Sequence, residues 1–283
     1  MRGLLKWVLI KGEVSTYNNI SISDIILNTS CKRAHTADSK YVACPKTETY
    51  MQHIQQVLEN RQQQLRRSPL CLMIDDASLA MESRLGFTPV MLFFVMGFKD
   101  ILDTMKDENS TDPLQQSVNT HCDEDSFHWQ WYLKDLERIS FGRTFLAQQG
   151  TTMFEKIWSA PYSAVREVVY ESIHLAKTYN TPFYKLVIIE ALEATFDCFN
   201  DPVFRLVNSM GRQNELEYFG QVHAHSEASH ALHEEEEADY LPDETEIKNA
   251  HLIVNRIFDA FEKVFDCWYR EGRLALTKLS IQN

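Results

Sequence analysis

The stretch "PFYKLVIIEALEATFDCF", residues 182–199, is apolar on nearly every side of a helix. A helix that is apolar all round is buried, so these residues predict a helix at the centre of a helical fold. Two glutamates, Glu190 and Glu193, interrupt the apolar surface. A glutamate in such a helix is rarely left alone, and either one could meet Lys185 or an arginine of a neighbouring helix. We expect at least one of the two to face polar groups from other helices instead.

The rest of the chain also has a helical composition, because only nine glycines and eight prolines interrupt its 283 residues. Start and stop signals predict helices over residues 47–67, 70–84, 89–106, 112–139, 161–179, 182–199, 223–240 and 244–272, with residues 200–214 turning the chain. Residues 1–44 are rich in Ser, Thr and Asn with β-branched residues, which favours an irregular or strand-like appendage. We expect one all-α domain over residues 45–283, a bundle of about eight helices.

Charge and cysteine content narrow the class of protein. A net charge of −12 argues against a nucleic-acid partner, since no basic stripe is present to neutralise phosphates. The longest apolar run, residues 89–98, is too short to cross a bilayer. Six scattered cysteines without a CxxC pair indicate neither a disulfide framework nor a zinc knuckle, and the first residues lack a signal-peptide cleavage site. We therefore expect a cytoplasmic protein with no membrane or nucleic-acid partner.

A histidine-rich stretch, "HAHSEASHALHEEEE", follows at residues 223–237. In a helix, His223, Glu227 and His230 lie on one face because their spacing is i, i+4 and i+7, while His225 points the other way. The same face continues back to the apolar Phe219 and Leu216, as it would in a partly buried stripe. Buried imidazoles and carboxylates need partners, and a divalent metal suits all three. The alternative is an exposed histidine-rich helix with an accidental spacing.

A second polar stripe lies within residues 118–139, where His121, Asp125, His128 and Tyr132 share one helix face. Asp125 and His128 form an acid-x-x-His pair, like Glu227 and His230. Two such pairs from separate helices, with a carboxylate from each of two others, form the ligand set of di-iron carboxylate bundles. Neutral imidazole nitrogen mixed with carboxylate oxygen suits iron or manganese.

In their order along the chain, these motifs resemble the heme-oxygenase-like di-iron oxidase/oxygenase family, which shares its helical fold with heme oxygenases, TenA-type thiaminases and the PqqC enzyme. The family pattern is an acid and a histidine on one central helix, a glutamate on a later helix, and then His-x3-Asp/Glu-x2-His. The resemblance covers residues 47–272 and implies the following metal ligands: Asp125 or Glu124 with His128, then Glu193 or Glu190, then His223, Glu227 and His230.

Two positions depart from the family pattern. Where some members carry an acid seven residues before the first histidine, this chain has His121. The acid must then be Glu124 or Asp125, or His121 itself must bind the metal. Glu227 stands where aspartate is commoner. Between the two glutamates of the central helix we favour Glu193, because it leaves Leu186, Ile189 and Phe196 flanking it on the inward face.

The resemblance implies that two ferrous ions, with manganese as an alternative, activate O2 to oxidise a small molecule such as an amine or amino acid. N-oxygenation and oxidative C–C cleavage within small-molecule biosynthesis are the expected reactions, and a homodimer is usual for the fold. The aromatic side chains Phe127, Trp129, Trp131 and Tyr132 would either line the substrate pocket or pack in the core. The alternatives are a non-catalytic helical binding protein with a vestigial site, and a heme-binding relative that uses His53.

Overall fold

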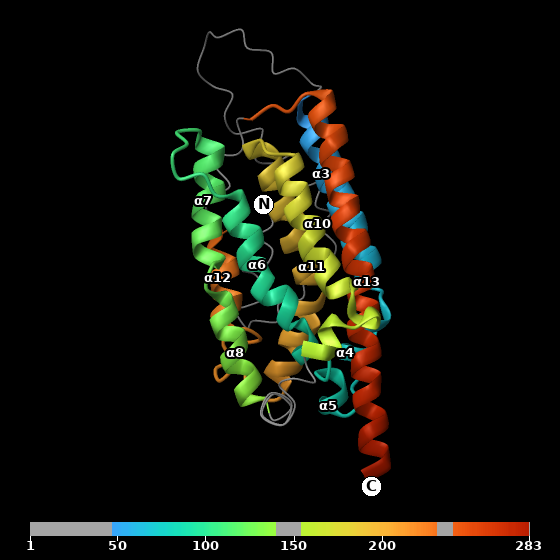
Figure 1. The fold of residues 1–283 in the computed structure, drawn as a ribbon. Helices are drawn as coiled ribbons and strands as arrows, with labels where there is room; N and C mark the ends of the chain where they lie inside the picture. Colours follow the sequence, from blue (N-terminus) through green and yellow to red (C-terminus); the bar gives the residue numbers. More distant parts are fainter. Residues whose placement is uncertain (1–46, 140–153, 231–239, 283) are drawn as a thin grey trace, which may run out of the picture.

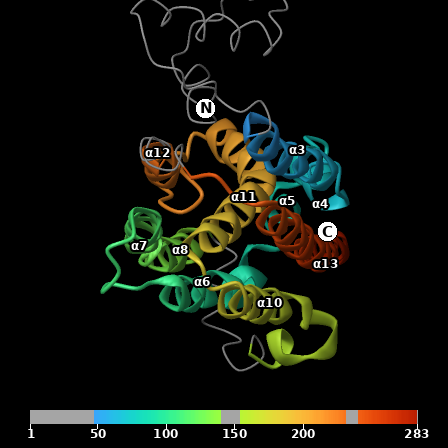
Figure 2. The same cartoon turned by 90° about the horizontal axis from the view of Figure 1, so that it is seen from above.

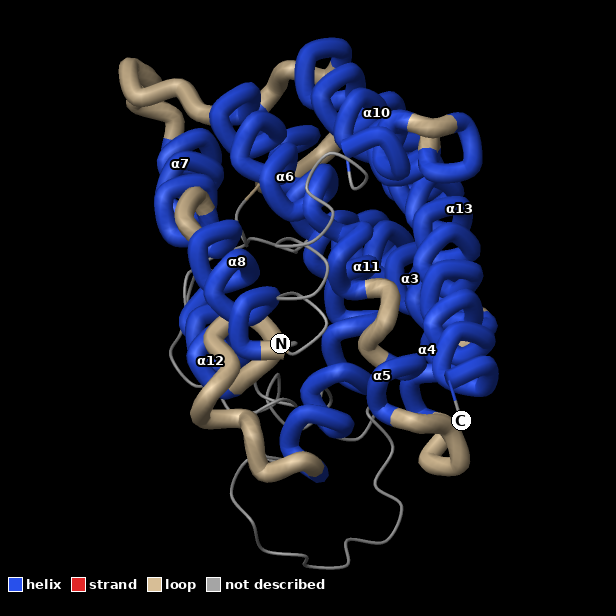
Figure 3. Tube along the Cα trace, turned by 60° about the horizontal axis from the view of Figure 1, so that its bottom comes forward, coloured by secondary structure: helices blue, strands red, loops and turns tan. Residues whose placement is uncertain are grey.

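The computed structural model describes residues 47–139, 154–230 and 240–282, and none of these residues forms a strand (Figure 3). The longer helices are α3 (Thr47–Leu65), α6 (Leu92–Met105), α7 (Pro113–Asp125), α8 (His128–Arg138), α10 (Ala164–Thr178), α11 (Pro182–Ser209), α12 (Gln221–His230) and α13 (Glu244–Gln282). The shorter ones are α4 (Pro69–Asp75), α5 (Met81–Arg84) and the 3₁₀ turns η1 (Thr88–Met91) and η2 (Ala160–Tyr162). The predicted all-α class is confirmed. The expected appendage at residues 1–44 lies outside the described residues.

The helix of the opening stretch, α11, lies at the centre of the bundle (Figures 1 and 2). It packs against α13, α4, α7, α3 and α10, so it is surrounded as its all-round apolar surface requires. Thr181 precedes its first turn and Pro182 opens it, as predicted. Among the described residues, no helix is long and apolar enough to cross a membrane.

Residues 200–214 were predicted to turn the chain, which is wrong for residues 200–209, because α11 continues through Pro202 to Ser209. The turn begins only at Met210. A proline inside a helix removes one N–H···O bond and leaves the carbonyl four residues earlier without its donor. Here that carbonyl belongs to Cys198, and it accepts the buried thiol of Cys71 at 3.2 Å. The helix ends only at Met210, where Gly211 adopts a φ of +70°.

Two helices predicted as continuous are interrupted. Residues 70–84 form α4 and α5, because the Asp76 carboxylate accepts the backbone N–H and the hydroxyl of Ser78 and so stabilises a turn. Residues 112–139 form α7 and α8, which are separated at Ser126 and Phe127. The Ser126 hydroxyl donates to the Asp123 carbonyl there, in competition with the helical hydrogen bonds. This second interruption falls between Asp125 and His128 of the predicted polar stripe.

The remaining boundaries differ less. The expected helices at 89–106 and 161–179 each begin with a 3₁₀ turn, η1 or η2, before α6 or α10. The last helix, α13, extends to Gln282 rather than ending near Gly272. Four cysteines in the described part of the chain, Cys71, Cys122, Cys198 and Cys267, are buried free thiols.

Candidate metal centre

Two helices bring three candidate ligands together. His121 and Asp125 lie one turn apart on α7, and Glu193 reaches them from α11. The His121 Nε2 atom lies 3.0 Å from Asp125 Oδ2 and 3.5 Å from Glu193 Oε1. One ligand atom from each residue lies within 4.8 Å of the others, as binding of a single metal ion requires. Asp125 is buried, whereas His121 and Glu193 are partly buried.

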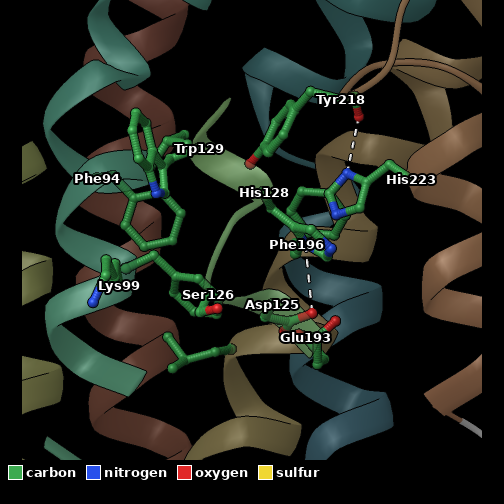
Figure 4. A pocket seen from close by; sticks show the side chains of 13 residues that line it. Phe94, Lys99, Asp125, Ser126, His128, Trp129, Glu193, Phe196, Tyr218 and His223 are labelled. Atoms are coloured by element: carbon green, nitrogen blue, oxygen red, sulfur yellow. Dashed lines mark hydrogen bonds and ion pairs between the residues drawn. The ribbon is translucent and has the colours of Figure 1, made fainter. Parts of the chain in front are cut away.

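The carboxylate of Asp125 also contacts the first residue of the next helix. Its Oδ1 atom lies 3.4 Å from His128 Nδ1, the contact drawn as a dashed line in Figure 4. Each oxygen of Asp125 therefore faces a different histidine, Oδ2 toward His121 and Oδ1 toward His128. The break between α7 and α8 does not separate these three residues.

The buried imidazole of His223, on α12, packs beside that of His128, with their ring centroids 4.6 Å apart. Its Nδ1 atom lies 2.9 Å from the backbone carbonyl of Tyr218. A carbonyl can only accept, so Nδ1 carries a hydrogen, and in the neutral imidazole Nε2 then has a free lone pair. A histidine that ligates a metal usually has its other ring nitrogen held in this way.

The ring of His128 is held on both sides. It stacks on Trp131 with centroids 4.4 Å apart and an interplanar angle of 20°. Its Nε2 atom lies 3.5 Å from the Ser226 hydroxyl of α12. The Trp131 ring is also in edge contact with His223. One aromatic residue therefore orients both histidines.

The charges of His121, Asp125 and Glu193 partly offset one another within the protein. Burial by itself would lower the pKa of His121, but its hydrogen bonds with Asp125 and Glu193 raise that pKa well above the ordinary histidine value. The imidazolium of His121 thus places a positive charge between two carboxylates. The donor set of one imidazole and two carboxylates fits a divalent cation such as Fe²⁺ or Mn²⁺, which would replace that proton.

A largely apolar cavity adjoins these groups and is lined at one side by Asp125, His128, Glu193 and His223 (Figure 4). Its other walls are mainly aromatic and aliphatic, formed by Phe94, Val95, Phe98, Trp129, Leu192, Phe196 and Tyr218, with Lys99 and Ser126. It encloses about 490 Å³ with its open mouth, but the space left for water is only about 30 Å³. That is enough for one or two water molecules.

The structure does not bring every predicted ligand into this cluster. Glu190 and Glu124 are half-buried and do not belong to the group of His121, Asp125 and Glu193. The side chains of Glu227 and His230 lie outside the described residues, so their role as metal ligands stays a prediction. The side chain of His53, the predicted heme ligand, also lies outside them.

Lys185 does not meet either glutamate through the contact that the sequence suggested. It is buried and donates to the side-chain oxygen of Gln115 at 2.8 Å, and burial lowers its pKa.

Leu216 and Phe219 are buried as expected, but they lie in the turn before α12 rather than on that helix. Of the four aromatic candidates, Trp129 lines the cavity, Trp131 stacks on His128, Tyr132 is fully buried and Phe127 is exposed.

Sequence reasoning missed Asp135, Tyr218 and the α6 wall of the cavity. Tyr218 contacts His223 through its backbone carbonyl, and the carboxylate of Asp135 on α8 accepts backbone N–H groups of residues 217–219. Contacts to the backbone leave no side-chain pattern. The apolar run in residues 89–98 was visible, but it indicated only a buried helix.

No protein-family model matches this chain, and the search of curated proteins also found no match. The family resemblance therefore depends on the quoted motifs and their order.

Proposed function

We propose that this protein is a non-heme di-iron oxidase or oxygenase that acts on a small molecule. The observation that carries the proposal is the Asp125 carboxylate, which directs one oxygen to His121, beside Glu193, and the other to His128, beside His223. Two neighbouring groups of ligands that share one carboxylate suit a pair of metal ions.

The residues divide between two ions. His121, Asp125 and Glu193 would hold one, and His128 and His223 would hold the other, with Glu227 and His230 as its further predicted ligands. Iron bound here would supply the activation of O2, which protein side chains cannot perform. Manganese is compatible with the same donor set.

The rest of the site has three tasks that the protein's own groups can perform. The Tyr218 carbonyl keeps the Nε2 lone pair of His223 available, and Trp131 fixes the plane of His128. The aromatic walls restrict water, which favours oxidation of the bound molecule over side reactions. The space of about 30 Å³ suits a molecule as small as O2, so a larger substrate would have to approach from the open side of the cavity.

Iron counting tests the proposal. The full-length chain, stripped of metal and reloaded with Fe(II) without oxygen, should bind about two irons per chain. Glu193→Ala should lose one iron, whereas Glu190→Ala, three residues away on the same helix, should keep both. If Glu190→Ala loses one iron and Glu193→Ala keeps both, the metal ligand is Glu190 rather than Glu193. If neither substitution nor His121→Ala changes the iron content, the di-iron proposal is wrong.

A non-catalytic binding protein is the second candidate. It is favoured by the raised pKa of His121, since a proton on this histidine offsets part of the charge of Asp125 and Glu193 without a metal. Such a protein should bind no Fe(II) or Mn(II) at all after loading. A heme-binding role is a weaker alternative, because the cavity has no room for a porphyrin while its aromatic walls stay in place.

A further inference from the structure

The chain reaches α12 through a turn, residues 215–219, that is fastened to α8 by one buried carboxylate. Asp135 of α8 has no exposed surface. Its Oδ1 accepts the backbone N–H of Glu217 at 2.8 Å, and its Oδ2 accepts those of Tyr218 and Phe219 at 2.8 and 3.0 Å. Three N–H groups that converge on one carboxylate resemble the anion-binding turns of other proteins, but here the anion is part of the chain.

Contacts at the surface reinforce this connection. The Arg138 guanidinium lies 3.4 Å from Asp135 Oδ1, pairs with Glu217 at 2.9 Å and donates to the Glu215 carbonyl at 2.8 Å. Lys134 also pairs with Glu217. Exposed ion pairs stabilise little, so Asp135 is the principal polar connection between α8 and the turn.

Both connected elements carry a predicted ligand. His128 is the first residue of α8, two helical turns before Asp135. Tyr218, held by Asp135 through its N–H, presents its carbonyl to His223 Nδ1. A residue whose N–H and C=O are both fixed has little freedom to turn, so the position of Asp135 sets the orientation of the His223 ring relative to His128.

We propose that Asp135 is a positioning residue of the metal centre, which holds His128 and His223 in the register that a shared ion requires. This inference rests on the proposed function, because it assumes that the two histidines bind metal. Asp135 lines no part of the cavity and would touch neither metal nor substrate. Loss of a residue that orients a metal ligand typically costs about 10-fold to 100-fold in metal affinity.

Co(II) is a suitable probe, since its visible absorption reports on coordination. The full-length, metal-free chain and the variants Asp135→Asn and His223→Ala are titrated with CoCl₂ at a temperature where circular dichroism shows all of them folded. The asparagine side chain has the same shape but only one oxygen to accept the three N–H groups. Asp135→Asn should weaken the binding step that His223→Ala removes by about 10-fold to 100-fold and alter its absorption spectrum. The ion at His121, Asp125 and Glu193 should stay bound.

Glu271→Gln is the matched control. Glu271 is also a buried carboxylate in polar contact with Lys156 and Tyr162, but it lies on α13, across the bundle from α12 (Figures 1 and 2). It should lower thermal stability without changing Co(II) affinity. If both variants lower the affinity equally, or if Asp135→Asn leaves it unchanged, Asp135 has only a structural role and the inference is overturned.

A third variant keeps the test decisive where Asp135→Asn does not fold. Asp135→Glu keeps the negative charge but displaces the carboxylate by one methylene group, so it should also lower the affinity of the His223-dependent step. An unchanged affinity there would overturn the inference. Failure of the wild-type chain to bind Co(II) at all would overturn the proposed function, whereas wild-type binding with unaffected variants would overturn the positioning role alone.

Discussion

Asp125 Oδ2 lies 3.0 Å from His121 Nε2, one helical turn away on α7. Some members of the family that the sequence resembles have an acid where His121 stands. Asp125 and Glu193 both contact this histidine, so their carboxylates favour its protonated form. This arrangement makes the charge of His121 one source of pH dependence in the metal-free protein.

The pH response of the metal-free protein follows from the raised pKa of His121. A raised pKa means that the folded state binds the proton more tightly than the unfolded state. The stability from this contact is fully present below the unfolded histidine pKa of 6.5 and is lost as pH rises through the folded value. Urea unfolding of the metal-free chain should show this loss above pH 6.5, and His121→Gln should remove it. An identical pH slope in the two proteins would contradict the assignment.

Asp125→Asn should affect both halves of the centre, because each carboxylate oxygen faces a different histidine. An amide offers one acceptor oxygen and places an NH₂ group against the other partner. We expect iron binding to fall below one ion per chain, a larger loss than for Glu193→Ala. Elemental analysis after anaerobic loading measures it, with Asp123→Asn, an exposed neighbour on α7, as the control. Equal losses for Asp125→Asn and Glu193→Ala would show that Asp125 serves only one ion.

Gly220→Ala should be strongly destabilising. A Cβ atom at Gly220 would lie 2.0 Å from the Leu216 carbonyl oxygen and 2.5 Å from that of Gln213, and backbone atoms cannot move aside cheaply. We expect a loss of more than about 2 kcal/mol in the free energy of unfolding, measured by denaturant titration.

Gly97→Ala is the comparison for that substitution. Its added Cβ would meet only side-chain atoms of Val169, the nearest at 2.9 Å, and alanine is the better helix former within α6. It should cost less than Gly220→Ala. The opposite order would mean that the turn before α12 adjusts more easily than the contact between α6 and α10.

The thiol of Cys71 and the ring of Pro202 should be coupled, because the thiol donates to the carbonyl that the proline deprives of its helical donor. Cys71→Ala should cost about 1–2 kcal/mol in stability. In a Pro202→Ala background the alanine supplies a backbone N–H that can serve this carbonyl, so the cost should fall by about 0.5–1 kcal/mol. A double-mutant cycle by thermal or chemical unfolding measures the difference. Additive effects would show that the contact contributes nothing.

The sequence allowed prediction of those features that depend on side-chain periodicity. The all-round apolar surface of residues 182–199 placed α11 at the centre, and the one-turn spacing of His121 and Asp125 placed them together. The convergence of Glu193, rather than Glu190, on this pair agrees with the preference drawn from its apolar flanks. Whether these residues bind metal remains a prediction.

The missed features depend on contacts between distant backbone groups. Pro202 looked like the end of a helix because its local effect is unfavourable, and the thiol of Cys71, far away in sequence, compensates for it. The interruption at Ser126 and Phe127 contains no glycine or proline, so no strong local signal marks it. The connection from Asp135 to residues 217–219 joins segments more than eighty positions apart.

The interruption between α7 and α8 has a consequence for the distance between the two proposed ions. In one continuous helix, His121 and His128 would keep a constant separation along the axis. Here they belong to two rods that meet at Ser126 and Phe127, with Asp125 on one side of the joint and His128 on the other. A small change in the angle between the rods would move one ion relative to its neighbour. In the proposed centre, a change in this angle would therefore alter the spacing between the two ions while each ion kept the same ligands.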